Sequence, residues 1–560
     1  MDDARGRWAQ VRLPAAGVGI GVALIAGPFL ATVIRSSLVW TGDSVHVSFG
    51  NFVNLFTDPR IGDAALNTLI AGVCTTALSL VLGFTLAFLV CRTDMPGRRW
   101  LETANLVPFF LSPYVGAISW IYLLAPHGGL FSTLAQRWWG VGMEWLNIYS
   151  VTGVIFVLTL FYTPYVYLFV IPPLREMDAA FEDAARVHGA SFWYTIRHIT
   201  LPLVLPSLLS AALIVFVTSA GLFDVPLALA SPRGIRFMPT EIYAMVQYPT
   251  DLGKAAAFGI VVLTVTILLT LWQRRFLAGR RFDTITGKGY RPRLIRLRWP
   301  GLIGALTLEF LYVGGGVLLP LMALLMVSFS RLWTGRFLWR TATFGNFDYI
   351  LRAYDLTRIA IGNSLFLAIV GASLGVCLAV LQGYYLTRGN PRWRTLAEVL
   401  LSLPLGIPGI ILGLGFLILG LRTPLYGTLA IILIAYIARF LPFAARGVTA
   451  MFLAISPELE QSARTSGATW RQTMRYIVLP LLKPSLVAAW LMLFVIFIRE
   501  LGATILLYAQ GTETISVAMV VLAERSSGYV AALAVVQLIL LLLAFALFHI
   551  SRASLSQRAP

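Results

Sequence analysis

Long apolar runs, separated by short polar segments, dominate the chain. The twelve runs lie near residues 14–38, 65–91, 103–125, 150–173, 203–223, 254–273, 301–328, 363–386, 398–420, 425–445, 485–507 and 530–550. A helix needs about 20 apolar residues to cross a bilayer, and the runs reach about that length. The pattern therefore predicts an all-α polytopic membrane protein with about 12 transmembrane helices.

The pattern repeats once along the chain, which indicates two parallel six-helix repeats. Residues 1–273 form the predicted first half, 274–299 a basic cytoplasmic linker, and 300–560 the second half. Two halves of the same orientation are related by an axis along the membrane normal, and the path between them is a natural solute route. The matching positions are Phe49-Gly-Asn-Phe52 and Phe344-Gly-Asn-Phe347, Asn67 and Asn363, Arg92 and Arg388, Pro108 and Pro404, and Pro164 and Pro442.

Basic residues set the predicted orientation. The net charge is +18, and arginines concentrate in every second connection between the runs, as the positive-inside rule expects. Both termini and the linker are therefore predicted to be cytoplasmic. The linker is expected to touch anionic lipid headgroups. This distribution argues against nucleic acid as a partner, although the net charge alone would suggest one.

Two polar islands on the predicted cytoplasmic side are closely similar. Glu182–Leu208 and Glu460–Leu486 align without a gap. Each island predicts two short helices outside the bilayer. Glycines end the first helix, hydroxyl residues cap the second, apolar residues form one stripe along it, and prolines end it. These residues are Gly189 and Gly467; Ser191 and Thr469; Phe192, Ile196, Ile199, Trp470, Met474 and Ile477; and Pro202 and Pro480.

The islands resemble the EAA loops of type I binding-protein-dependent ABC importers. The first copy has Glu182, Ala184, Ala185, Gly189, Ile199, Leu201 and Pro202; the second has Glu460, Ala463, Gly467, Ile477, Leu479 and Pro480, with Ser462 at one alanine position. The resemblance implies that the glutamates fix the loops and that the apolar stripes fill grooves of ATPase subunits. The implied partners are two ABC ATPase subunits, which bind ATP and magnesium, and an extracytoplasmic solute-binding protein. The implied location is the bacterial cytoplasmic membrane.

No catalytic chemistry is expected of the chain itself. Gly287-Lys288-Gly289 lacks the spacing and the hydroxyl residue of a phosphate-binding Walker A loop, so ATP hydrolysis would belong to the partner. His, Cys and carboxylate residues show no metal-ligand spacing, and the three cysteines form no motif pair. We therefore expect no bound cofactor, no fixed metal and no enzyme activity.

Charges and prolines in the apolar runs are the candidates for the solute path. Asp224 and Glu500 occupy nearly corresponding places, so they could face each other across the path, or be interfacial with polar neighbours. Whether Glu309, Arg499 and Glu500 line the path or are structural stays open. Helix-breaking prolines either line a cavity or only kink the helix. They are Pro108, Pro113, Pro404 and Pro408.

Fusion of two such halves in one chain resembles the ferric-iron permeases and, in the same group, the thiamine permeases. Segment 436–446 before the second island also looks like that group. The resemblance implies an importer permease for Fe(III), with thiamine as the alternative solute and polyamines or a phosphonate after it. A secondary transporter that needs no ATPase is a further alternative, since it too can have twelve spans in two parallel halves.

Overall fold

The computed structural model describes residues 2–41, 44–278 and 294–556 and is almost entirely helical. The chain folds into two compact units, and each is described by itself. Unit 1 comprises residues 1–57, 242–261 and 347–560, and unit 2 comprises residues 58–241 and 262–346. The compact units therefore do not follow the halves of the sequence repeat, whose boundaries stay a prediction.

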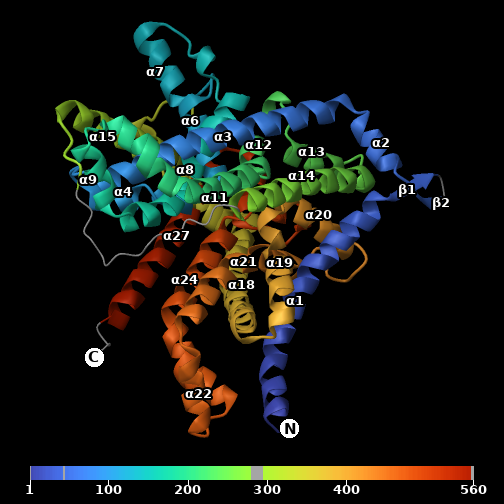
Figure 1. Cartoon of the computed structure of the whole chain (residues 1–560). Coiled ribbons are helices and arrows are strands. Elements are labelled where there is room, and N and C mark those ends of the chain that lie inside the picture. Colours follow the sequence, from blue (N-terminus) through green and yellow to red (C-terminus); the bar gives the residue numbers. More distant parts are fainter. Residues whose placement is uncertain (1, 42–43, 279–293, 557–560) are drawn as a thin grey trace. The chain divides into compact units, whose positions relative to one another are not determined.

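Unit 1 is built around three long helices, α18 (Asp355–Arg388), α21 (Leu429–Ala454) and α24 (Leu479–Ile498), which pack along one another. Helix α1 (Asp2–Ser36) lies beside α18 and α20 (Gly409–Gly420) (Figure 1). The remaining elements are β1 (Leu38–Thr41), β2 (Ser44–Val47), α2 (Gly50–Phe56), α19 (Pro391–Ser402), α22 (Pro457–Thr465), α23 (Trp470–Thr473), α25 (Thr504–Leu507), α26 (Ile515–Ala523) and α27 (Ser527–Ser556).

Unit 2 has the same central arrangement. Helices α3 (Pro59–Arg92), α8 (Val151–Glu176) and α11 (Leu201–Ala220) pack together, and α16 (Leu319–Ser328) packs on α6 (Pro113–Leu124). The remaining elements are α4 (Arg98–Ala104), α5 (Val107–Phe110), α7 (Leu130–Trp139), α9 (Ala179–Val187), α10 (Phe192–Thr195), α12 (Asp224–Leu229) and α15 (Trp299–Val313). Helices α13 (Met238–Val246), α14 (Leu252–Ala278) and α17 (Gly345–Asp348) cross the unit boundaries.

The first helix of each sequence half belongs to the compact unit that holds most of the other half. Small residues make the close approach of α1 to its neighbours possible, because a Cβ on Gly415 would lie 2.5 Å from the backbone oxygen of Pro28. In unit 2 the Tyr312 hydroxyl of α15 donates to the Leu160 carbonyl of α8 at 3.2 Å. The sequence repeat did not indicate that the first helix of each half would pack in the unit that holds most of the other half.

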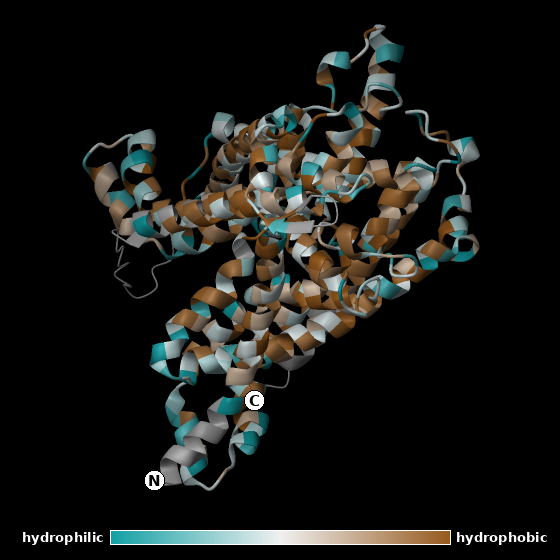
Figure 2. Ribbon diagram, turned by 90° about the vertical axis from the view of Figure 1, so that its right-hand side faces the viewer, coloured by the Kyte–Doolittle hydropathy of each residue, from teal (hydrophilic) through white to brown (hydrophobic). Residues whose placement is uncertain are grey.

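The predicted membrane architecture is confirmed. Among the described residues nine helices are long and apolar enough to span a bilayer, one bent pair passes as a broken span, and Leu252–Leu268 and Gly409–Gly420 are shorter apolar helices. Each of the twelve predicted runs overlaps one of these segments. Figure 2 shows apolar residues along the long helices and polar residues gathered mainly at their ends and connections.

The third and ninth spans are not straight helices. Helices α4–α5 and α6 meet at 97°, with the break at Leu111 and Ser112 between Pro108 and Pro113. In the ninth run α19 ends at Ser402, a 3₁₀ turn follows at Leu403–Gly406, and α20 begins only after Pro408. Proline lacks the amide donor that a continuous helix requires, which accounts for both breaks.

Candidate coupling loops

The local geometry of both polar islands follows the sequence prediction. Gly189 (φ +77°) and Gly467 (φ +84°) adopt the left-handed conformation directly beyond helices α9 and α22. The Ser191 hydroxyl accepts a hydrogen bond from the Tyr194 amide at the start of α10. Thr469 and Gln472 form the expected reciprocal capping box. Each island is therefore a helical hairpin turned at a glycine.

The expectation that Pro202 and Pro480 end the second helices is wrong. Each proline lies in the first turn of a long membrane helix, α11 or α24. Five π-helical residues, Ile196–Thr200 and Met474–Val478, join that helix to the short one before it. Proline is tolerated in a first turn, and the wider π turn accommodates the change in hydrogen bonding before it. The second helix of each hairpin thus continues directly into a span.

A buried ion pair anchors the first hairpin; we call it the first clasp. Arg92 Nη2, at the end of α3, donates to Glu182 Oε2 of α9 at 2.5 Å, and the side chains are only 0% and 4% exposed. Arg92 also reaches the Met177 carbonyl at the end of α8, at 3.5 Å. Thr200 Oγ1 donates to Glu182 Oε1 at 3.1 Å. The clasp therefore joins two membrane helices to the hairpin.

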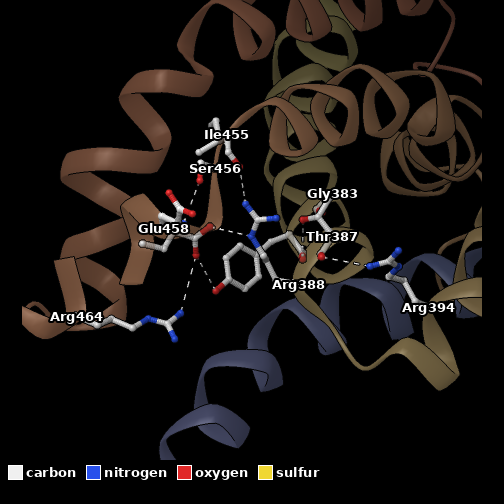
Figure 3. Close-up of polar contacts among 10 residues, drawn as sticks. Gly383, Thr387, Arg388, Arg394, Ile455, Ser456, Glu458 and Arg464 are labelled. Carbon is white, nitrogen blue, oxygen red and sulfur yellow. Dashed lines mark hydrogen bonds and ion pairs between the residues drawn. The ribbon is translucent and has the colours of Figure 1, made fainter. Parts of the chain in front are cut away.

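A second clasp occupies the corresponding position in unit 1 (Figure 3). Arg388 Nε, at the end of α18, donates to Glu460 Oε1 at 3.0 Å. Arg388 Nη2 donates to the Ile455 carbonyl at the end of α21, at 2.8 Å. Tyr384 donates its hydroxyl to Glu460 Oε2 at 3.4 Å, and Arg464 lies 3.9 Å from the same oxygen. Two separate parts of the chain thus build the same arginine–glutamate–carbonyl arrangement.

The two clasps obtain the hydroxyl donor from different elements. In the first clasp the donor is Thr200, whereas the equivalent residue of the second loop is Val478, which has no hydroxyl. In the second clasp it is Tyr384 of α18, and Phe88 is its equivalent in α3. An uncompensated buried carboxylate is costly, so each copy keeps a neutral donor in addition to the arginine. In the sequence, Arg92 and Arg388 could be identified only as matching positions of the two halves. Their glutamate partners could not be predicted from it.

The predicted apolar stripe is only partly buried against the protein's own helices, and Phe192 remains 45% exposed. Phe192 lies edge-on to Phe88, with ring centroids 6.1 Å apart, and Trp470 lies edge-on to Tyr384 at 5.8 Å. Met474 is buried. Ile196, Ile199 and Ile477, like Ala185 and Ala463, are half-buried.

The outward face of each hairpin carries other side chains. Trp193 is 75% exposed, Tyr194 54% and Tyr476 69%. These three aromatic residues, which lie outside the predicted stripe, are more exposed than Phe192 of the stripe. The coupling role of the hairpins stays a prediction, and Trp193, Tyr194 and Tyr476 are exposed in addition to the expected Phe192.

A short segment near the end of the predicted linker 274–299 completes the first hairpin's surroundings. The Ile295 amide donates to the Arg92 carbonyl at 2.8 Å, and the Asp94 amide donates to the Ile295 carbonyl at 3.1 Å. Ile295 also lines a cavity of about 230 Å³ together with Glu182 and Phe192. The clasp is therefore closed from this side by backbone that joins the two halves. The predicted lipid contact of the linker falls mostly on residues outside the described part.

The candidate path residues have local partners. Glu500 is buried and pairs with Arg439 Nη1 at 2.6 Å, and Thr504 Oγ1 donates to it at 2.6 Å. This arrangement matches the structural alternative for Glu500. Asp224 is buried at the start of α12 in unit 2, and its alignment with Glu500 across a path stays a prediction. Arg499, at the end of α24, is half-buried.

The other intramembrane candidates are also packed. Glu309 is buried in α15 and accepts a hydrogen bond from Asn105 at 3.4 Å, a partner that the sequence did not reveal. Pro108, Pro404 and Pro408 are buried, and Pro113 is half-buried. In the described part of the chain, no group of three or more His, Cys, Asp or Glu side chains could hold a metal ion.

Comparison with known proteins identifies a transport family. The profile described as "Binding-protein-dependent transport system inner membrane component" matches residues 66–282 and again 375–557. The Fe(3+)-transport system permease protein FbpB 2 of Haemophilus influenzae is 25% identical over 88% of this chain and 88% of its own length. The ferric transport system permease protein FbpB of Actinobacillus pleuropneumoniae is 23% identical over 79% of this chain and 63% of its own.

A shorter relative matches about half of this chain. The molybdenum transport system permease protein ModB of Mycobacterium bovis is 29% identical over 92% of its own length, but it covers only 47% of this chain. A chain of that size thus corresponds to about half of the present one, as the two profile matches also indicate.

Proposed function

The chain belongs to the family of binding-protein-dependent transport system inner membrane components, and on this basis we propose that it is the permease subunit of an ATP-driven Fe(III) importer. In this proposal it spans the bacterial cytoplasmic membrane many times, with both termini in the cytoplasm. A solute-binding protein delivers the solute on the outer side, and two ATPase subunits bind on the cytoplasmic side. The chain itself hydrolyses nothing.

The observation that carries the coupling part of the proposal is the pair of clasps. Each hairpin is held to membrane helices by an arginine that pairs with a buried glutamate, Arg92–Glu182 or Arg388–Glu460, and leads without interruption into a span. A force applied to a hairpin would therefore move the helices attached to it, because a well-packed interior transmits displacement. A secondary transporter has no need for two such anchored cytoplasmic hairpins.

Fe(III) is proposed as the solute because two curated relatives with extensive matches are named as ferric transport permeases. The acidic pair Asp224 and Glu500 gives weaker support than the sequence suggested, since Arg439 neutralises Glu500 locally. Thiamine, a polyamine and a phosphonate remain the alternatives to test. Thermal unfolding of the cognate binding protein with each solute decides among them: Fe(III) should raise its melting temperature, and a rise with thiamine alone would overturn the choice.

The coupling proposal is tested by reversing the charge of both clasp glutamates, Glu182→Lys and Glu460→Lys. Each lysine would face an arginine, Arg92 or Arg388, so we expect the hairpins to detach from α3 and α18, with uptake lost while the membrane helices remain folded. Uptake and ATP hydrolysis are measured in proteoliposomes with the ATPase and the binding protein. Size-exclusion elution and helical circular dichroism check the fold.

Glu458→Lys is the matched control, because Glu458 lies exposed in the same turn as Glu460. Its uptake should equal that of the wild type. Restoration of uptake by the exchanged pair Arg388→Glu/Glu460→Arg, in a chain that keeps the first clasp, would further support the second clasp as the coupling contact. Wild-type uptake by the double glutamate variant would refute the assignment.

A further inference from the structure

The outer connections that follow the first span of each half share one anchor. In both, the asparagine of the Phe-Gly-Asn-Phe motif donates one hydrogen bond to the last carbonyl of the preceding helix and one to a carbonyl two residues further on. The bonds join Asn51 to Ser36 and Leu38 at 2.9 and 3.0 Å, and Asn346 to Ser328 and Ser330, both at 2.8 Å. The two loops are therefore copies of one structural device.

The charges of the two copies differ in sign. Trp40-Thr41-Gly42-Asp43 corresponds to Trp333-Thr334-Gly335-Arg336, so an aspartate in the first copy stands where the second has an arginine. The second loop, residues 331–342, also contains Arg340 and no acidic residue; we call it the basic outer loop. Outer connections are normally poor in arginine, so topology does not account for this cluster.

The basic outer loop is a defined structure. An antiparallel bridge between Ser330 and Ala342 closes its base. At its tip Gly335 (φ +79°) packs so closely on helix α7 that a Cβ would lie 2.1 Å from Thr133 Oγ1. The Trp333 ring lies against Tyr122, with centroids 6.4 Å apart. The loop therefore presents its outward side chains from a fixed backbone.

Those outward side chains are aromatic, aliphatic and cationic. Trp339 is 83% exposed and Leu332 77%, and Arg331, Arg336 and Arg340 are exposed with no ion pair among the described residues. Helix α7, which the loop tip contacts through Thr133, adds the exposed Trp138 and Trp139. Tryptophan and arginine are the residues most enriched at the energetic centres of protein interfaces.

We propose that the basic outer loop, with the end of α7, is the docking surface for an acidic face of the extracytoplasmic solute-binding protein. This inference rests on the proposed function, which supplies that partner and the outer location. Lipid is the disfavoured occupant. The two loops follow corresponding spans and would meet the outer leaflet alike, yet only one of them is basic. The two loops share one structure but differ in charge. This difference is expected if a partner binds only the basic outer loop.

The test measures binding of the Fe(III)-loaded binding protein to the full-length permease in nanodiscs of zwitterionic lipid, at two salt concentrations. The variant Arg331→Glu/Arg336→Glu/Arg340→Glu should weaken binding at least about tenfold, mainly by slowing association, and should remove most of the salt dependence. The single variant Arg336→Asp, which copies the residue of the first loop, should weaken binding about threefold without disturbing the fold.

The control is Arg352→Glu/Arg358→Glu, which reverses two exposed arginines at the end of the same connection and the start of α18, in unit 1. Its affinity should stay within about twofold of wild type. Wild-type affinity of the triple variant would overturn the inference, as would a loss confined to nanodiscs of anionic lipid, which would indicate a lipid contact. If the wild-type chain itself bound no binding protein, the proposed function would fail instead.

Discussion

The first clasp allows a quantitative test in which the second clasp is an internal reference. The substitution is Arg92→Met, which removes the charge but keeps a flexible apolar stem of similar length. Arg92 is 0% exposed and Glu182 4% exposed, so the variant leaves a carboxylate buried without its cation. The equivalent change in the second clasp is Arg388→Met.

The two substitutions should differ in cost because the sites differ in burial and in remaining partners. Removing one member of a buried ion pair costs about 3–5 kcal/mol. Among the side chains that the structure describes, Glu182 would keep the hydrogen bond from Thr200, worth about 1 kcal/mol, so we expect about 3 kcal/mol. Arg388 is 16% exposed, and Glu460 would keep Tyr384 and Arg464 nearby, so about 1 kcal/mol is expected there.

Hydrogen exchange of backbone amides measures this difference where it arises. A gap of about 2 kcal/mol corresponds to about 30-fold in the opening equilibrium, since 1.4 kcal/mol is tenfold. Amides of 179–200 in Arg92→Met should therefore lose about 30-fold more protection than amides of 457–478 in Arg388→Met. The double variant Arg92→Met/Glu182→Leu should regain most of the protection, because it leaves no unpaired charge.

Two outcomes would contradict this reasoning. If Arg92→Met exchanged like the wild type, the ion pair would not hold the hairpin. If the double variant were as unprotected as the single one, the loss would come from packing of the arginine stem instead of from the stranded carboxylate.

Three further predictions concern other parts of the chain. Gly467→Ala should destabilise the second hairpin by about 1 kcal/mol, because the φ of +84° disfavours a residue with a Cβ. The destabilisation is measured as faster proteolysis of the hairpin, with Ser466→Ala as the control. Equal cleavage rates of the two variants would argue against backbone strain at Gly467. Arg439→Leu should lower the melting temperature in detergent, since it strands the buried Glu500, and unchanged melting would show that the pair is not needed. Gly415→Val should loosen the packing of α1 on α20, which is measured as faster hydrogen exchange in residues 12–36. Exchange at the wild-type rate would show that α1 does not depend on this close contact.

The sequence predicted the elements whose signals are local. Apolar runs mark the spans, and glycine and hydroxyl residues mark the turns and caps of the hairpins, because helix ends are governed by residues within one turn. It failed where a side chain's partner is distant along the chain. Arg92 lies 90 positions from Glu182, and nothing in either neighbourhood announces the pair.

The direction of the apolar stripe illustrates the same limit. Phe192 and Trp470 have helical spacing with their neighbours, and periodicity shows that a helix has an apolar face. It does not show whether that face meets the protein's own helices or a partner. Phe88 and Tyr384, which receive the two rings, lie in spans far along the chain, so the packing became visible only in the folded structure.

The most direct measurement is Fe(III) uptake by proteoliposomes that contain the purified chain and the binding protein, with and without the ATPase subunits and ATP. The account predicts uptake only when both ATPase and ATP are present, and its loss in the variant Glu182→Lys/Glu460→Lys despite continued hydrolysis. Uptake that persists without any ATPase, driven by an ion gradient alone, would contradict the claim that the clasped hairpins deliver the driving force.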